Sequence, residues 1–569
     1  MEKRAVLAIA LSVLILLGWL WLFPPPKPEP QTAAPPASAT ADEPPPPESP
    51  AVSPDAVPAP AAQAEAPLAA DAPEETRVEH DRMAVVLTNR GGRVRSWTLR
   101  DYRDSAGKPL ELVPAFGVRE DLLPAAVDLD DEALAARINS ALFRIERETI
   151  GDAPGGGERI VLRWADGQGL SVRKELTFRR GDWLVDIRLD VTDRGRRLPA
   201  RLAWGPGFEA LDPKVGSSQI HYTGQVVIDQ GGSVTRTRRV KETTVARETG
   251  RLRWAGLDEQ FFAALILPAG GRGDVVVRPL AIAPEPPPDA APDASKPKPV
   301  PQMLVAVGIP PEGARLFVGP KKYTLLRDLG QDLDAVVWFS SYSLIYWLAK
   351  YLFLALLWIH ESVVSNYGLA IILATVVLRL LFFPLNQYSM VQMRKMQTQM
   401  QRIQPKINAI KAKYKKMKDA KDRGKMNEEM MALYRKEGVN PMGGMSGCLP
   451  MLLQLPILIA FYNVLTVAVE LRAAPFFGWI GDLTLKDPLY VTPLLMGATM
   501  FIQQKMTTTK GGDPLQQRMM MMMPAVFTVM FLNLPSGLTL YWFVNNVLGI
   551  GQQWLVNRHI GRIETAGAA

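Results

Sequence analysis

A single arginine inside a membrane-length apolar stretch constrains this chain more than any other feature. Residues 366–385 read NYGLAIILATVVLRLLFFPL, and Arg379 is the only charged residue among them. A helix needs about 20 mostly apolar residues to cross a bilayer. A charge at that depth costs roughly 2.5–3.5 kcal/mol on insertion scales and usually marks a functional site. The sequence therefore predicts a protein that works inside a membrane.

The positive charge of the chain is concentrated in one segment. The formal net charge is +8 over 569 residues, and residues 388–447 hold 14 Lys and Arg against 5 Asp and Glu. A local patch of this kind does not indicate a general nucleic-acid binder. One cysteine, Cys448, excludes an intrachain disulfide, and four scattered histidines make a metal site improbable. We also find no nucleotide-binding or hydrolase motif, so neither a cofactor nor enzymatic catalysis is expected.

The N-terminal segment has the pattern of a membrane anchor. Lys3 and Arg4 precede an apolar run that ends by residue 23 and contains Trp19 and Trp21. The apolar core of a cleaved signal peptide is usually about 7–15 residues long, so the greater length here favours an uncleaved anchor over residues 1–23. Residues 24–76 are rich in Pro and Ala, a composition typical of an extended linker.

Residues 77–333 alternate apolar and polar side chains with period two, between turns rich in Gly and Asp. Examples are DRMAVVLTNRGGRVRSWTLRDY and GLSVRKELTFRRGDWLVDIRLDVTD. This pattern predicts a large β-sandwich. His80 and His221 are isolated in it, and we find no catalytic constellation there.

The distribution of cations sets the predicted topology. Residues 366–386 form a span that leads to a Lys- and Met-rich helical hairpin over residues 387–447, and the positive-inside rule places this hairpin in the cytoplasm. If residues 334–365 also crossed the membrane, the hairpin would lie outside, so this stretch is predicted as an interfacial helix. Residues 448–558 hold four more spans, and residues 559–569 form a short cytoplasmic tail. The four spans are expected at about 449–471, 489–503, 519–534 and 538–555. Two of them are short, which leads to the hypothesis of a locally thin bilayer.

Two interpretations of Arg379 remain open. It lies in the cytoplasmic half of its span, where its side chain could snorkel to water. Alternatively, it faces a wet cavity and pairs transiently with an acidic group, with Thr375 on the same helical face. The spans also carry Gln454, and no acid in their middle neutralises Arg379. Several asparagines lie within or near the apolar runs, at Asn463, Asn533, Asn545 and Asn546. Each of these polar groups could equally join helices to one another.

The hairpin carries methionines at spacings of three and four, which place them on one helical face. They either form an adaptable surface for varied partners or pack the two helices against each other. The first helix contributes Met390, Met393, Met396 and Met400, and the second contributes Met430 and Met431.

Several long motifs resemble the YidC/Oxa family of membrane protein insertases over essentially the whole chain. They are LRLLFFPLNQYSM, MQRIQPKINAIK, EEMMALYRKEGVNPMGGMSGCLPMLLQLPI and LPSGLTLYWFVNN, with LTNRGGRVRSWTLRDY resembling the start of the periplasmic β-supersandwich of Gram-negative members. The resemblance implies a multi-domain membrane protein with an α-helical five-span insertase core, an N-terminal anchor helix and that periplasmic domain. It implies a substrate groove that is open to cytoplasm and lipid. The groove residues that carry over are Arg379, Thr375, Gln454, Tyr541 and Trp542.

The implied function is that of an insertase and chaperone without covalent catalysis. Its partners would be nascent membrane proteins and the lipid bilayer, with the Sec translocon and the ribosome as further candidates and no direct nucleic-acid partner. The implied location is the bacterial inner membrane, with both termini in the cytoplasm. One alternative is a secondary transporter for a small anion, although no inverted repeat is visible. Another is an anchored mutarotase-like enzyme, which would need a His/Glu constellation in residues 77–330.

Overall fold

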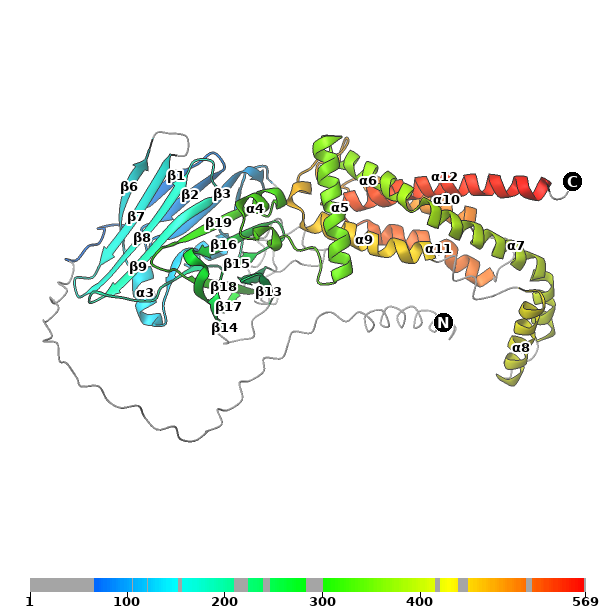
Figure 1. Cartoon of the computed structure of the whole chain (residues 1–569), viewed down its shortest axis with the longest axis horizontal. Coiled ribbons are helices and arrows are strands. Elements are labelled where there is room, and N and C mark those ends of the chain that lie inside the picture. The colour runs from blue at the N-terminus through cyan, green and yellow to red at the C-terminus, as the bar shows by residue number, and fades with distance from the viewer. Residues whose placement is uncertain are drawn as a thin grey trace, which may run out of the picture.

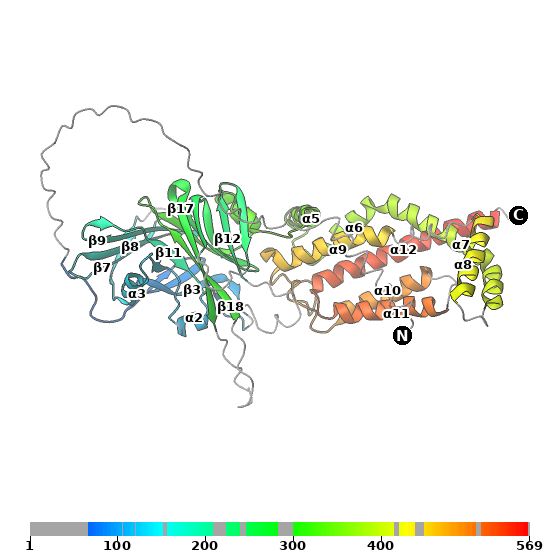
Figure 2. The ribbon, with the colours of Figure 1, turned by 90° about the horizontal axis from the view of Figure 1, so that it is seen from below.

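The computed structural model describes residues 66–566, except residues 105, 120, 152–155, 209–223, 239–245, 283–299, 415–419, 439–448 and 508–513. The predicted anchor over residues 1–23, nearly all of the predicted linker, His221 and Cys448 lie outside the described residues. A strand-rich domain lies at one end of the molecule, a helical core follows it, and a helical hairpin lies at the far end (Figures 1 and 2). The first strand begins at Glu75, slightly before the predicted start of the β domain.

The strand-rich domain consists of three antiparallel sheets. The four-stranded sheet has the order β1 (Glu75–Glu79), β2 (Met83–Thr88), β3 (Arg93–Arg103), β4 (Pro109–Glu111). The largest sheet has the order β13 (Ser233–Thr237), β12 (Gln225–Gln230), β15 (Trp254–Asp258), β16 (Phe262–Pro268), β19 (Ala314–Pro320), β9 (Leu184–Asp193), β8 (Leu170–Arg179), β7 (Gly157–Ala165), β6 (Arg144–Ile150), with β10 (Arg196–Arg197) beside β9. The third has the order β14 (Ala246–Arg251), β17 (Arg272–Ile282), β18 (Val300–Gly308), β11 (Arg201–Trp204), β5 (Ala126–Asp128).

An aromatic cluster joins the three sheets in the core of this domain. Trp97 of β3 lies edge-on to Trp204 of β11, with ring centroids 5.9 Å apart, and its ring is 6.4 Å from that of Phe178 of β8. All three side chains are fully buried. Large aromatic side chains bury more apolar area than any others, so this contact is a major source of the cohesion between the sheets. Short helices α2 (Ala115–Arg119) and α3 (Glu132–Ser140) lie beside the strands.

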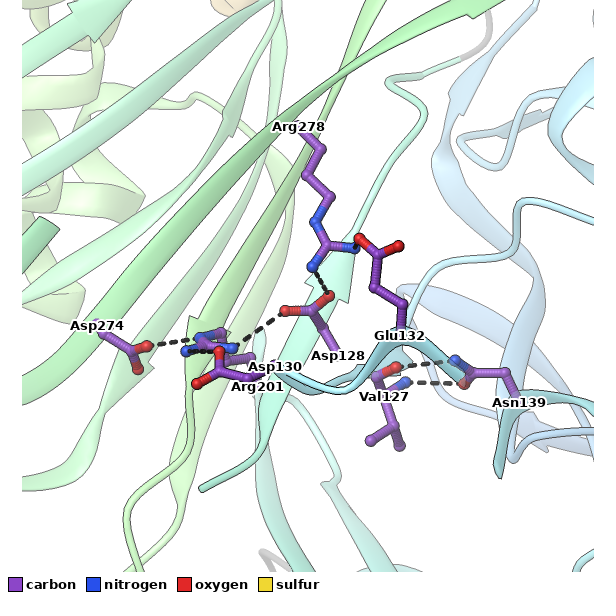
Figure 3. A network of polar contacts seen from close by, with 8 residues as sticks. All are labelled: Val127, Asp128, Asp130, Glu132, Asn139, Arg201, Asp274 and Arg278. Atoms are coloured by element: carbon purple, nitrogen blue, oxygen red, sulfur yellow. Dashed lines mark hydrogen bonds and ion pairs between the residues drawn. The ribbon is translucent and has the colours of Figure 1, made fainter. Parts of the chain in front are cut away.

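A network of ion pairs ties the third sheet to the segment that leads into α3 (Figure 3). The guanidinium of Arg201 is buried and contacts Asp274 at 2.5 Å, Asp130 at 3.0 Å and Asp128 at 3.4 Å. Arg278 contacts the other oxygen of Asp128 at 2.8 Å. Because each buried charge has several oppositely charged neighbours, the cost of removing it from water is offset. This cluster joins β5, β11 and β17 to the residues that precede and begin α3.

The chain then passes through α4 (Tyr323–Leu329) and the 3-10 turn η2 (Leu333–Val336) to α5 (Ser343–Ser362). Residues 334–365, predicted as one interfacial helix, thus hold the end of η2 and then α5. In Figure 1 this helix runs across the long axis of the molecule, whereas the helices that follow run along it. Its buried face, which includes Phe353 and Leu356, packs against α9, and its opposite face exposes Trp347 and Trp358.

The remaining helices form the core and the hairpin. They are α6 (Tyr367–Leu381), α7 (Phe383–Lys413), α8 (Ala420–Lys436), α9 (Leu449–Val467), α10 (Val491–Thr507), α11 (Pro514–Phe531) and α12 (Ser536–Ala566), with a 3-10 turn η4 (Val469–Leu471) after α9. Helix α12 packs against α6, α9 and α10. It continues to Ala566 and so includes most of the segment over residues 559–569, which stays a predicted short cytoplasmic tail.

The predicted straight span over residues 366–386 is bent in the structure. Helix α6 ends at Leu381, and the first part of α7 departs from its axis by 58°. Pro384 explains the bend, because it has no N–H to donate to the carbonyl of Leu380 and its ring clashes with that turn. Helix α6 is only 15 residues long, or roughly 22 Å at 1.5 Å per residue. Among the described residues, α5 alone passes a length and apolarity test for a spanning helix, and the bent α6–α7 pair would be a second.

Three hydrogen bonds fasten the β domain to the helical core. Gln260 donates to the carbonyl of Thr466 at 2.9 Å, and the backbone N–H of Tyr323 donates to the carboxylate of Glu470 at 2.9 Å. Arg472 donates to the carbonyl of Arg103 at 2.9 Å. The carboxylate of Glu470 is therefore engaged at the junction with the β domain.

Lys174 provides a test of the β-domain core. Its ammonium is fully buried and donates to three carbonyl oxygens, those of Gly91, Gly92 and Ala125, at 2.7–3.2 Å. We expect Lys174→Met to destabilise the domain by at least about 1–3 kcal/mol, the cost of a single buried group left without its hydrogen bond. The urea dependence of pulse proteolysis of the full-length protein in detergent measures this loss. The exposed Lys108→Met is the control, and equal stability of the two variants would contradict the prediction.

Candidate functional site

Arg379 lies in the last turn of α6, toward the hairpin end of the core. Its side chain is half-buried, and its Nε atom is buried without a hydrogen-bond partner in the described part of the chain. No carboxylate of the described residues forms an ion pair with it. The guanidinium extends across to α12 and α10, where it lies close to Gly549 and Gln503. The expectation of a cation that pairs transiently with a substrate acid stays a prediction.

Gln454 and Tyr541 form a polar contact between α9 and α12. The Gln454 side-chain amide donates to the Tyr541 hydroxyl. The ring of Tyr541 is fully buried and stacks on Phe461, with centroids 4.3 Å apart. The charge of Arg379 also acts electrostatically on Tyr541. The structure therefore brings together three of the five groove residues that the resemblance supplied, and we call Arg379, Gln454, Gln503 and Tyr541 the inter-helix polar cluster.

The other two predicted groove residues are placed differently. Thr375 is buried, and its hydroxyl donates to the carbonyl of Ile371 at 2.6 Å, a local bond that is common for threonine in helices. Trp542 is half-buried and packs against Phe531, with ring centroids 5.8 Å apart. Its indole N–H has no hydrogen-bond partner among the described residues. Trp542 thus contributes packing in this structure, and its donor is unused.

Sequence reasoning did not identify Gln503 and Gly549 as part of this site. Gln503 lies at the end of a predicted span, where a polar residue is unremarkable, and a glycine in an apolar helix has no distinctive pattern. Both residues are recognised only when α6, α10 and α12 are seen packed together. Asn546, one turn before Gly549, was noted as a buried polar group, and it donates to the carbonyl of Met496 at 3.3 Å.

At the end of the core that faces the β domain, several polar groups lie around Asp487. The carboxylate of Asp487 accepts hydrogen bonds from the Trp479 indole, the Leu489 amide and both the amide and the hydroxyl of Thr492, at 2.7–2.9 Å. The Thr492 hydroxyl also lies 2.8 Å from that of Thr539 on α12. The polar groups around Asp487 are therefore bonded within the chain, whereas Oε2 of Glu470, at the junction with the β domain, is buried without a partner among the described residues.

The hairpin has a small core of its own. Ile403 and Ile407 of α7 are buried, and Met400 packs against them together with residues of α8, which are Met430, Leu433 and Tyr434. Two ion pairs close the hairpin, Lys406 with Glu437 and Lys413 with Glu429, both at 2.6 Å. Met431 points outward with 46% of its surface exposed, and Met390 is half-buried. The side chains of Met393 and Met396 lie outside the described residues. Met400 and Met430 thus pack the two helices against each other, while an adaptable surface for partners stays a prediction.

Together, these features define an inner-membrane protein with a strand-rich periplasmic domain and a helical core, and the comparisons with known families agree. Residues 75–355 match the family described as the YidC periplasmic domain, and residues 358–563 match the 60Kd inner membrane protein family. The chain belongs to the YidC family.

Individual relatives match over nearly the full length. A protein of Syntrophus aciditrophicus named membrane protein insertase YidC is 33% identical over 90% of both chains. A protein of Geobacter metallireducens with the same name is 36% identical over 86% of this chain and 87% of the relative. A crystal structure of an active YidC insertase with its first transmembrane domain resolved is 18% identical and covers 86% of this chain and 95% of its own, with a TM-score of 0.35. A secondary transporter, the alternative drawn from the sequence, is not supported.

The Gln454–Tyr541 contact can be tested by a double-mutant cycle. Hydrogen bonds between membrane helices contribute about 0.6 kcal/mol on average and up to about 1.7 kcal/mol. We expect Gln454→Leu and Tyr541→Phe to show a coupling energy in this range when the full-length protein is unfolded in mixed micelles. The pair Gln454→Leu and Trp542→Phe is the control, because the Trp542 indole N–H has no partner in the described part of the chain. Equal coupling in the two cycles would show that the hydrogen bond contributes nothing specific.

Proposed function

We propose that this chain is a membrane protein insertase and chaperone. Its inter-helix polar cluster transiently binds the polar flank of a nascent membrane protein. The observation that carries the proposal is Arg379, which is half-buried between helices without a carboxylate partner among the described residues. A charge in an apolar environment is costly without a partner. An acidic group of an arriving substrate supplies that partner.

The proposed topology has an N-terminal anchor and five further spans, α6, α9, α10, α11 and α12. These helices run along the long axis between the β domain and the hairpin, which supports opposite sides of the membrane for the two (Figures 1 and 2). They also expose many apolar side chains, as expected for surfaces in contact with lipid. Examples are Val377, Leu380, Leu494, Val526 and Val529.

In this topology the β domain is periplasmic, and the hairpin and both termini are cytoplasmic. Helix α5 lies in the outer interface. Its direction across the long axis and its exposed Trp347 and Trp358 support this placement, because tryptophan favours the membrane–water boundary.

The proposed mechanism proceeds in two steps. The hairpin first captures an apolar segment, with Met431 and Met390 as adaptable contacts, since methionine accommodates varied apolar shapes. The acidic or polar flank then enters from the hairpin side and meets Arg379, with the Gln454–Tyr541 pair, Thr375 and Trp542 nearby. The carboxylate of Asp487 already accepts four hydrogen bonds within the chain, so the flank finds its polar partners at Arg379 and the residues near it.

The final step is release of the apolar segment into lipid. Burial of apolar surface, worth about 25 cal/mol per Å², supplies the driving force. The membrane potential assists an acidic flank that crosses to the positive side. The short α6 supports a locally thin bilayer beside the cluster, because about 22 Å of helix does not match a hydrocarbon layer of about 30 Å. The Sec translocon and the ribosome are proposed as further partners.

The role of Arg379 is tested by inserting a one-span substrate with an acidic translocated tail into proteoliposomes. We expect Arg379→Lys to retain insertion and Arg379→Ala to lose about tenfold or more, because an unpaired acid costs roughly 2.5–3.5 kcal/mol at the bilayer centre. Lys505→Ala, which removes an exposed cation of α10, is the control. A substrate with an uncharged tail should not distinguish the variants. If Arg379→Ala inserts the acidic substrate as well as the wild type, Arg379 only snorkels and the proposal fails.

A further inference from the structure

A glycine of α12 lies directly against the charged end of Arg379. A Cβ atom added at Gly549 would lie 2.4 Å from Nη2 of Arg379 and 2.7 Å from Nε2 of Gln503. Real Cβ atoms essentially never come within 3.0 Å of another heavy atom outside their own bonded neighbours. Only glycine at this position leaves room for both side-chain ends. The Arg379 guanidinium of α6, the Gln503 amide of α10 and the backbone of α12 therefore meet at Gly549.

The residues around Gly549 form a polar seam between α10 and α12. Asn546, three residues earlier on α12, lies 3.4 Å from the Thr499 hydroxyl of α10. Gln503 follows Thr499 by four residues, so it lies on the same face of α10, as Gly549 does relative to Asn546. The Arg379 side chain enters this seam from α6, at the end nearer the hairpin.

We propose that Gly549 is a positioning residue, and that Gly549 and Gln503 form a seat that fixes the orientation of the Arg379 guanidinium toward an incoming acidic group. The inference rests on the proposed function, because it assumes that Arg379 receives a substrate carboxylate. A guanidinium is a planar fork that pairs with a carboxylate through two parallel hydrogen bonds. Its orientation therefore matters as much as its charge.

The chemistry of the contact makes alanine at this position a selective probe. The two atoms that a methyl group would displace are the ends of flexible side chains, so they can move away while the helices stay packed. Alanine also has a higher helix propensity than glycine, so α12 itself is not weakened. The substitution should thus shift the charge and leave the fold in place.

The test compares Gly549→Ala with Gly551→Ala, in full-length protein reconstituted into proteoliposomes. Gly551 lies two residues further along α12, and a Cβ there would meet nothing within 4 Å. We expect Gly549→Ala to slow insertion of a substrate with an acidic tail about fivefold, a modest loss that corresponds to imperfect pairing. Insertion of the same substrate with an uncharged tail should be unchanged, and Gly551→Ala should match the wild type with both.

The same substitution in the Arg379→Lys background separates positioning from helix packing. A lysine ammonium lacks the forked arm that lies over Gly549, so Gly549→Ala should cause no further loss there. The positioning role would be wrong if Gly549→Ala slowed insertion equally with acidic and uncharged tails. It would also be wrong if Gly549→Ala caused the same fivefold loss in the Arg379→Lys background. If Gly549→Ala inserts the acidic substrate normally while Arg379→Ala fails, the positioning role of Gly549 is wrong and the proposed role of Arg379 stands. If Arg379→Ala is also unimpaired, the proposed function falls with it.

Discussion

A cation held between apolar helices, with no carboxylate partner among the described residues, is the constraint on which the helical core depends. The helices around Arg379 must provide dipolar groups that stabilise its charge, but no carboxylate that would pair with it permanently. Gln503 and Tyr541 meet this requirement, because they are dipolar and carry no charge at neutral pH. A resident carboxylate would stabilise the folded protein further, but it would also occupy the position that a substrate acid has to take. In the proposed function, an acidic group of the substrate supplies the partner that Arg379 lacks among the described residues.

The bend at Phe382 connects this constraint to the rest of the structure. Because Pro384 ends the hydrogen-bond ladder of α6, Arg379 lies within one turn of a helix end, where water and an arriving chain can reach it. The same break changes the direction of α7, which leads to the hairpin at the end of the molecule opposite the β domain (Figure 1). A continuous helix would have buried Arg379 farther from its exit and joined the hairpin rigidly to the core.

The sequence predicts well those features that are local and periodic. The alternation of residues 170–193 is confirmed by β8 and β9, whose side chains alternate between buried and more exposed positions along much of their length. The sheet order is beyond such reasoning, since β16 pairs with β19 across an intervening hairpin of β17 and β18. Thr375 shares a face with Arg379, as helical spacing requires, yet its hydroxyl bonds the Ile371 carbonyl, an acceptor that every helix offers four residues back. The role of Gly549 depends on its lack of a side chain, and a hydrophobic pattern in the sequence cannot reveal such a role.

The polar groups around Asp487 and those around Arg379 differ in how completely they are bonded, and this difference gives the proposed insertion a direction. At the periplasmic end, Asp487 accepts four hydrogen bonds within the chain and so has little capacity left for a substrate. Toward the hairpin end, the Arg379 guanidinium retains an Nε–H group that no described residue accepts, and the Trp542 indole N–H, nearer the start of α12, also has no partner there. In the proposed mechanism, a polar flank that enters from the cytoplasm gains partners at Arg379 and in the polar groups near it, while Asp487 offers it little. Apolar burial and the membrane potential must drive the remaining distance, and the short α6 keeps that distance small.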